Sequence, residues 1–575
     1  MGSVGLTDTY SVPKESKTIL ESGIFNNPKL GPLLPPGTSS FANKVKFTGN
    51  SLPSLPINWR FAESSAALKG LEACVVANLV KKKYGVDISG ATINTDHASL
   101  FSMSTLVWSV PGFKKDSPLE LPKELRSLIP DYGFHNMASS IYRASATNIH
   151  ETKDGKYFHI HSSLNPNPTL EALGLPTEDP NDSKTWEDAM STIKAAVKSK
   201  NADELQILMS DQYKQAGQIC ETVESFRASE HGKANEHVAL FECHDVPVEG
   251  QGPSWWPDSA QTSAERPLAG LKVVDLTRII AAPAVTRGLA ELGASVMRVT
   301  SPNICDYSAL HVDLSWGKWS CSLDLKTEEG RQKLKGLILE ADVVLQGYRP
   351  GVLDKYGFGQ QGIIDLCKDR RRGIVSAREN CYGWNGPWVY RSGWQQISDA
   401  CCGVSERFGR AMGLKNGEAV TPVFPNSDYC TGLAGVIGII TALMRRAEKG
   451  GSYKVDLSLN YYSQWLTESV GEYPEEVWQD VWQRNGRKVW RSHHNMTQTL
   501  GPFVQMIKKN SGDVVFNPDF FETRETKALG ININTIKPIV KFDNDEVRLA
   551  YNVGTRGNGK DQPRWPQDLM VEVVS

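Results

Sequence analysis

The sequence predicts an α/β fold, with a Rossmann-like parallel sheet in a large domain and a smaller α+β domain beside it. Strand-like and helix-like segments alternate regularly after residue 267, and such alternation is typical of a parallel sheet flanked by helices. The first half instead mixes helical segments with short runs of alternating apolar residues. A chain of 575 residues exceeds the usual size of one domain, so two or three domains are expected.

The alternation begins with a βαβ unit. LKVVDLT (residues 271–277) predicts a buried strand, PAVTRGLAELGA a helix opened by Pro283, and SVMRVTSP a second strand. KWSCSLDLK, TEEGRQKLKGLILEA and DVVLQGY then predict strand, helix and strand, with Glu328 and Glu329 in the first helical turn. Ligands of such sheets bind at the carboxyl ends of the strands, which here are followed by the loops TRIIAAP and GYRPG.

Composition predicts the domain boundaries. Residues 1–55 are rich in Ser, Pro and Gly and predict a poorly structured leader, and the similar stretch 246–267 predicts a linker. Between them, residues 56–245 include the strand-like KYFHIHSSL and two amphipathic helical segments, as expected for the smaller domain. Residues 268–470 form the predicted large domain, and residues 471–575 a C-terminal segment that returns to it.

Charge and cysteine content exclude several classes of protein. Lys and Arg number 63 against 65 acids, with no long basic block, so nucleic acid is not an expected partner. The ten cysteines form no CxxC or CxxH spacing, so no metal site is predicted and reduced thiols in the cytoplasm are expected. The longest apolar stretch, residues 433–444, is about half of what a membrane span requires, so we expect a buried helix and no membrane association.

Common catalytic motifs are missing as well. No GxGxxG follows the first strand and no GxxxxGK[ST] occurs, which disfavours nicotinamide and nucleoside-triphosphate chemistry. HExxH and GxSxG are also absent, which disfavours zinc-protease and hydrolase functions.

Several sequence segments, taken together, resemble one protein family. PLAGLKVVDLTRIIAAP, LGASVMRV, KWSCSLDLK, ADVVLQGYRPGVLDKYGFG and YGWNGP occur in order, and Asp428 then precedes the apolar helix that leads to GGSYKVDLSL. Together they resemble the large domain of family III CoA-transferases (CaiB/BaiF), the group that includes formyl-CoA transferase and α-methylacyl-CoA racemase. The resemblance implies that coenzyme A or an acyl-CoA is a substrate.

The resemblance also implies where CoA would bind. The family's CoA contacts map onto the loop after the first strand, the end of the third strand and the turn after the fourth, with a basic phosphate ligand just beyond. Small residues allow a ligand close to the backbone, and cations donate to phosphate oxygens. The positions in this sequence are Ile280, Ala281, Leu323, Lys326, Gly347, Tyr348, Arg349 and Lys355. After the second strand, where the family often has an Arg, this sequence has Ser301, and Arg298, further back in that strand, is the alternative.

This sequence departs from the family pattern at the two positions where the family carries its catalytic Asp. The family pattern, counted back from Asp428, places Asn416 at the position of the transferases' nucleophilic Asp. In the segment GWQQISDACCG, Gln395 stands at the position of the racemases' Asp. An amide forms no anhydride and takes up no proton, so both mechanisms are in doubt. Asp399, one helical turn after Gln395, and Glu418, two residues after Asn416, are candidate replacements, although a structural role is favoured for both.

The first half resembles the same family more faintly. DGKYFHIHSSLNP and LEALGLP look like the family's small domain, out of order, and VVANLVKKKYG followed by ATIN is similar to IITALMRRAEKG followed by KVDL. These similarities favour a fused tandem whose first copy is degenerate, and a circular permutation would give a similar order. His159 and His161 share one strand face, which permits a metal or acid–base pair but is more typical of packing.

The expected function is therefore that of a family III CoA-transferase-like enzyme acting on a CoA thioester or a related carboxylic acid. One alternative is an isomerase, epimerase or cyclase of a secondary metabolite, working through orientation and hydrogen bonds from Gln395 and Asn416. The other is a non-catalytic paralogue that binds CoA or a partner subunit. A homodimer is compatible with the sequence, which does not name the acyl group, the acceptor or the pathway.

Overall fold

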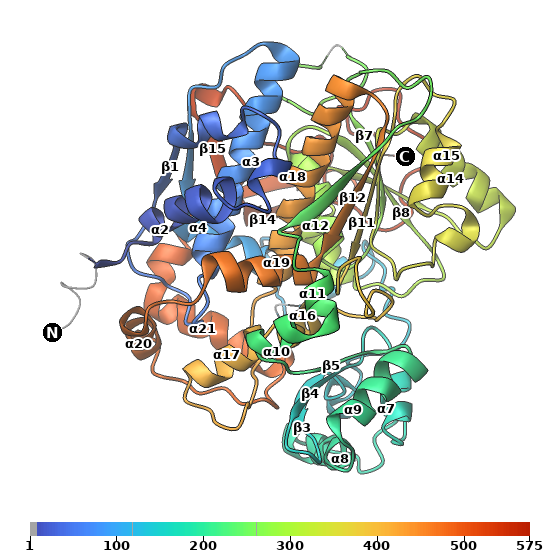
Figure 1. Ribbon diagram of the computed structural model, residues 1–575. Helices are drawn as coiled ribbons and strands as arrows, with labels where there is room; N and C mark the ends of the chain where they lie inside the picture. The colour runs from blue at the N-terminus through green and yellow to red at the C-terminus, as the bar shows by residue number, and fades with distance from the viewer. Residues whose placement is uncertain (1–8, 118, 260, 575) are drawn as a thin grey trace.

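A computed structural model describes residues 9–117, 119–259 and 261–574 (Figure 1). Its centre is a seven-stranded sheet in the order β6-β12-β11-β10-β7-β8-β9. Neighbouring strands pair in parallel, except that β6 is antiparallel to β12. The strands are β6 (Phe241–Val246), β7 (Lys272–Leu276), β8 (Ser295–Thr300), β9 (Lys318–Ser322), β10 (Val343–Gln346), β11 (Val375–Asn380) and β12 (Ser452–Ser458).

Apolar side chains bury both faces of this sheet. One face packs against α12 (Ala281–Glu291) and α18 (Asn426–Lys449), the other against α14 (Glu328–Glu340) and α15 (Gln360–Leu366). Thr327 caps α14 by accepting a hydrogen bond from the Gly330 N–H, and acids occupy its first turn as predicted. The strand order confirms the predicted α/β class with its parallel sheet.

The direction of the chain across the sheet reverses between β7 and β10. From β7 the chain continues to β8 and β9 on one side, whereas β10, β11 and β12 extend to the other. The crevice at the carboxyl ends of the strands beside such a reversal is the usual ligand site of an open α/β sheet. The loops after β7 and β10 flank this crevice.

Helix α18 lies in the core of the protein. Among the described residues it is the one helix long and apolar enough for a membrane span, and its apolar window is wholly buried inside the protein. It packs against α12 and against α3 (Phe61–Tyr84), a second long buried helix. A buried core helix is therefore what the apolar stretch of residues 433–444 forms.

The first half contains a small counterpart of the β11-α18-β12 arrangement. β1 (Val45–Thr48) and β2 (Ala91–Asn94) pair in parallel and are connected through α3, while β15 (Val540–Phe542) pairs antiparallel with β2. This strand–helix–strand order is what a degenerate first copy would retain. The fused tandem remains a prediction.

Residues 9–55 differ from the poorly structured leader expected from their composition. They form α2 (Val12–Thr18), a further helical segment η1 (Ile19–Phe25) and β1. Leu20 and Ile24 are buried, in the same apolar core as α3. A few apolar residues thus suffice to fold this segment against the buried helix α3, a contact that composition does not reveal.

A separate small unit packs below the main body in Figure 1. Its antiparallel sheet has the order β3-β4-β5, and its helices bury a core of their own. The elements are β3 (Asn148–Glu151), β4 (Tyr157–His161), β5 (Ala216–Ile219), α6 (Ile141–Ala144), α7 (Asn167–Ala172), α8 (Trp186–Lys198) and α9 (Ala202–Gln206). This arrangement matches the small α+β domain expected in the first half.

The remaining segments join these parts. The expected linker is anchored, because Trp256 is buried and its indole N–H donates to the Ala269 carbonyl. The hairpin strands β13 (Phe521–Thr526) and β14 (Ile531–Ile536) lie in the C-terminal segment. Other helices are α4 (Thr95–Ser99), α5 (Ser104–Val107), α10 (Val223–Ala228), α11 (Glu230–Ala234), α13 (Ser308–Leu314), α16 (Gln395–Cys401), α17 (Val404–Ala411), α19 (Leu459–Trp465), α20 (Glu475–Arg484) and α21 (Met496–Val515).

Candidate active site

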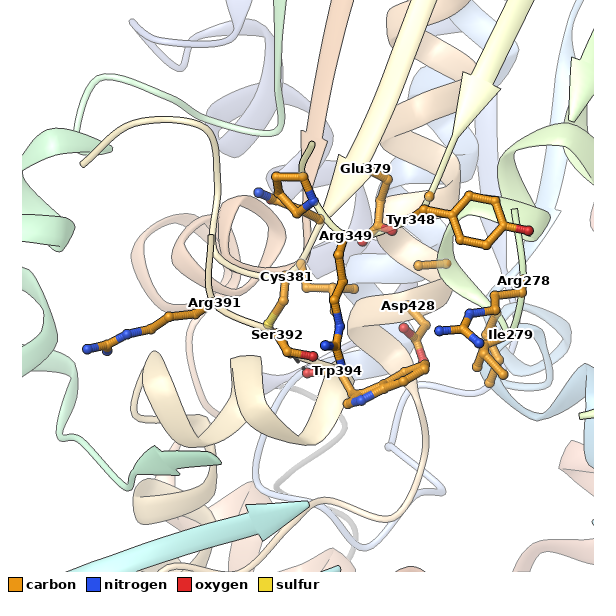
Figure 2. Close-up of a pocket in the computed structure, with 17 residues that line it drawn as sticks. Arg278, Ile279, Tyr348, Arg349, Glu379, Cys381, Arg391, Ser392, Trp394 and Asp428 are labelled. Carbon is orange, nitrogen blue, oxygen red and sulfur yellow. Dashed lines mark hydrogen bonds between the residues drawn. The ribbon is translucent and has the colours of Figure 1, made fainter. Parts of the chain in front are cut away.

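Three adjoining cavities follow the crevice at the carboxyl ends of the strands. The outer cavity, of about 220 Å³, lies over the ends of β8 and β9. Tyr348 lines both it and the central cavity, which Figure 2 shows. Ile279, Ile280, Trp394 and Asp428 line both the central cavity and a third one, the apolar cavity, of about 200 Å³. The shared wall residues thus place the three cavities next to one another along the crevice.

Most of the predicted CoA-binding positions line these cavities. The sheet brings them together because the loops after β7, β9 and β10 all leave its carboxyl edge. The outer cavity is lined by Leu323, Lys326, Tyr348 and Lys355. The central cavity is lined by Ile280, Ala281, Gly347, Tyr348 and Arg349.

Cations that make no ion pair within the described chain surround the outer and central cavities. Lys326 and Lys355 line the outer one, and Arg278, Arg349 and Arg391 the central one. Their hydrogen bonds are to backbone, as when Arg278 donates to the Cys305 carbonyl and Arg349 to the Lys214 carbonyl. Burial and the neighbouring Arg278 lower the pKa of Arg349. An uncompensated cluster of this kind favours a polyanionic ligand.

The loop after β7 holds a strained residue at the wall between two cavities. Ile279 has φ 69°, in the left-handed region that a β-branched side chain rarely adopts. Below it, Asp275 accepts hydrogen bonds from the hydroxyls of Thr277 and Thr286 and from the Lys318 ammonium. This buried network fixes the base of the loop. Backbone strain held in place by its surroundings is common at ligand sites.

Asp428 lies where the central and apolar cavities meet, in the first turn of α18. Its side chain is 8% exposed, and within the described chain no side chain or backbone N–H bonds to its carboxylate. Burial raises the pKa of Asp428 to about 8. A carboxylate that is poorly solvated and open to a cavity is well placed to act as a nucleophile.

A second acid lines the central cavity beside Asp428. Glu379, near the end of β11, has a pKa raised to about 8, first by burial and then by the charge of Asp428. Figure 2 shows both carboxyl groups at the central cavity. Two buried carboxyls so close together resist being ionised together.

Gln395 lines the apolar cavity from the first turn of α16. Its amide donates a hydrogen bond to Asp399, one turn further along. Burial raises the pKa of Asp399 well above its ordinary value, and the hydrogen bond from Gln395 opposes that shift. Asp399 is not among the residues that line the described cavities, so it can position Gln395 but does not reach a ligand there.

Three predicted positions lie elsewhere. Arg298 is buried and paired with Asp306 at 2.8 Å, because its side chain leaves β8 toward the interior and not toward the crevice. Asn416 stands on an exposed turn with φ 58°, and Glu418 is paired with Arg491 at 2.7 Å. These three are corrections to the predicted site, since none of them lines one of the three cavities.

Sequence reasoning missed the carboxyls and most of the apolar wall. The family pattern uses Asp428 only as a reference position, and no motif in the sequence singles out Glu379. The available signal for Asp428 was an acid in the first turn of an apolar helix, an unusual place for a charge. The apolar cavity combines segments far apart in the sequence, including residues 105–164 and 495–497, and no local pattern links them.

One further group of potential metal ligands lies on the sheet edge. Ligand atoms of Glu242, His244 and Asp456 lie within 4.8 Å of one another. Glu242 already accepts a hydrogen bond from the Tyr461 hydroxyl, and Asp456 is paired with Arg378. The half-buried Glu242 and the buried Asp456 thus both have partners within the protein.

Comparison with known proteins places the chain in a family. The family model described as CoA-transferase family III matches residues 268–497. An acetyl-coenzyme A transferase of Hypoxylon pulicicidum is 48% identical over 567 residues, which is 98% of this chain and 95% of that protein. The chain belongs to CoA-transferase family III. This confirms the family and the transferase class predicted from the sequence.

Two further proteins are similar to this chain at lower identity. An acyl-CoA transferase of Gibberella moniliformis is 30% identical and covers 88% of each chain. A solved structure of a CaiB/BaiF family protein from Brucella suis has 20% identity and a TM-score of 0.37, covering 50% of this chain and 95% of that one. Both the family-matched segment and most residues of the outer and central cavities lie after residue 267.

Proposed function

We propose that this protein transfers CoA from an acyl-CoA to a carboxylic acid, with Asp428 as the nucleophile. The observation that carries the proposal is the position of Asp428, an unpaired buried carboxylate at the junction of a cation-lined cavity and an apolar one. The phosphates of CoA would bind near Lys326, Lys355 and Arg349, and the acyl group would enter the apolar cavity. Membership of the family and the transferase names of the relatives support this assignment.

The transfer needs four balanced steps. The Asp428 carboxylate attacks the thioester carbonyl carbon, the C–S bond breaks, and CoA leaves as a thiolate from a mixed acyl-aspartyl anhydride. The thiolate then attacks the aspartyl carbonyl and releases the donor as a free carboxylate. The acceptor carboxylate attacks the resulting aspartyl-CoA thioester and again expels the thiolate. Attack of that thiolate on the acceptor's carbonyl forms the new acyl-CoA and restores Asp428.

The surroundings of Asp428 fit these steps. Poor solvation makes a carboxylate more reactive toward a thioester, and the anhydride would be sheltered from water by the walls shared between the cavities. Asp428 lies at the amino end of α18, where the helix dipole stabilises negative charge on the carboxylate. Gln395, held by Asp399, would orient a carboxylate in the apolar cavity by hydrogen bonding.

A cytoplasmic location forms part of the proposal. All ten cysteines are free thiols, and eight of them are buried. Free thiols in this number are typical of a reducing compartment. CoA esters and their acceptor acids would be available there without a transport step.

The experiment is a CoA-exchange assay with the full-length protein. Acetyl-CoA and an acid are incubated with it, and the new acyl-CoA is measured by mass spectrometry. We expect transfer with the native chain and none with Asp428→Asn, while CoA still stabilises both against heat. Isomerised substrate without exchange would favour the isomerase alternative, and CoA binding without any turnover would favour the non-catalytic one.

A further inference from the structure

The apolar cavity differs chemically from the two cavities that precede it. Of the described residues that line it, none is Lys or Arg, and Asp428 is the one acid. Much of its wall consists of Leu106, Leu164, Ile280, Leu310 and Met496. A ligand group bound there would lose its water and find no positive charge to pair with.

The polar side chains on this wall are already engaged within the protein. The Tyr307 hydroxyl donates to the Leu119 carbonyl, and the indole N–H of Trp394 donates to the Ser163 hydroxyl. His161 accepts a hydrogen bond from the Ser163 N–H, and burial lowers its pKa well below the ordinary value, which keeps it neutral. The wall therefore offers few free donors to a charged substituent.

The size of the cavity sets what it can hold. Apolar cavities of about 150 Å³ take up a benzene-sized molecule, and this one has about 200 Å³. An acetyl group would leave most of it empty, whereas a branched or cyclic hydrocarbon would fill it and bury apolar area.

We propose that one of the two acids exchanged at Asp428 is an apolar monocarboxylic acid with a bulky hydrocarbon part, and that dicarboxylic acids are rejected. This inference rests on the proposed function, because Asp428 fixes where the reacting carboxyl lies. A second carboxylate on the same skeleton would be buried without a cation, and such burial is strongly unfavourable. Part of the selectivity then comes from wall residues within 105–164, which precede the family-matched segment.

Binding and turnover with matched acids test the proposal. Octanoic acid and octanedioic acid have the same carbon skeleton and differ in one carboxylate. Isothermal calorimetry with the CoA-saturated protein should show octanoic acid binding at least about tenfold more tightly, since an unpaired buried charge costs several kcal/mol. In the exchange assay octanoic acid should be the better acceptor by a similar factor.

Two variants distinguish a change in the apolar cavity from a loss of folding. Ala144→Leu should fill part of the cavity and weaken the binding of octanoic acid more than the binding of acetic acid. Thr147→Lys should supply a cation and shift the preference toward octanedioic acid. Both residues line the apolar cavity and neither lines the outer or central one, so an unchanged CoA affinity shows that the variant is folded.

These experiments distinguish failure of this inference from failure of the proposed function. Equal binding of the two acids, or tighter binding of the diacid by the native chain, overturns the inference even if exchange occurs. The preference for octanoic acid in calorimetry without any exchange would uphold the apolar binding site and contradict the proposed reaction. Variants that leave the preference unchanged while CoA still binds would place the acid elsewhere and overturn the inference.

Discussion

The charge of Asp428 raises the pKa of Glu379 across the central cavity, in addition to the larger effect of burial. The pKa of each carboxyl rises to about 8, in both cases mainly through burial. Repulsion between two carboxylates is mutual, so loss of the first proton from this pair hinders loss of the second. Of the two, Asp428 also lines the apolar cavity, and this position assigns the reactive carboxylate to it.

The first prediction concerns the pH dependence of exchange. A nucleophilic carboxylate must be ionised, so kcat/KM in the native protein should rise with pH as Asp428 loses its proton, with a midpoint near 8. Glu379→Gln should keep this rise but move its midpoint to lower pH, because the variant removes a carboxyl whose charge opposes ionisation of Asp428. Asp428→Asn should abolish exchange at every pH. A Glu379→Gln variant that is inactive throughout, beside an active Asp428→Asn, would reverse the assignment.

The second prediction concerns the cations. Arg349→Ala combined with Lys355→Ala should weaken CoA binding on the order of tenfold or more, since charge-assisted hydrogen bonds each contribute roughly 1.5 to 3 kcal/mol. Calorimetry against CoA measures the change, and the affinity of the native chain should fall with added salt. Lys335→Ala, an exposed lysine on α14, is the matched control and should leave affinity unchanged. Unaltered binding by the double variant would place the phosphates elsewhere.

Sequence and structure agree most closely where a pattern is local. The strands of the large sheet and their parallel order follow from apolar runs and alternation, and the loops after β7, β9 and β10 were located correctly as cavity walls. Arg298 shows a limit of this reasoning, because a strand residue can point to either face and its partner Asp306 lies beyond the strand.

The apolar cavity shows a second limit. Ala144, His161, Leu310 and Met496 meet in it from four separate parts of the chain. Their proximity depends on how the small unit, the large sheet and the C-terminal segment pack together, and long-range packing leaves no periodic signal in the sequence. Counting along the chain for the same reason placed the nucleophile at Asn416, twelve positions before the buried acid that reaches the cavity.

The third prediction follows from that correction. Asn416→Ala and Asn416→Asp should both leave kcat and KM within about twofold of the native values, because the side chain lies on an exposed turn away from the three cavities. Steady-state kinetics with acetyl-CoA and octanoic acid provide the measurement. If Asn416→Asp raised transfer while Asn416→Ala abolished it, the amide would have to belong to the active site after all.

The fourth prediction concerns the organisation of the chain. A single cut within residues 246–267 should leave two fragments that stay associated, because β6 precedes the cut and pairs with β12, and α3 packs against α18. Limited proteolysis followed by size-exclusion chromatography tests this. Fragments that separate under native conditions would show that the two halves are independent domains.

The most direct test of the account is to find the residue that carries the acyl group. The native protein is mixed with octanoyl-CoA, treated with hydroxylamine, digested and analysed by mass spectrometry, because hydroxylamine converts an aspartyl anhydride or thioester into a stable hydroxamate. We predict modification of the peptide at Asp428, none at Gln395, Asn416 or Glu418, and no adduct in the Asp428→Asn variant. A hydroxamate on Glu379, Asp399 or Glu418, or rapid exchange by Asp428→Asn, would contradict the central claim.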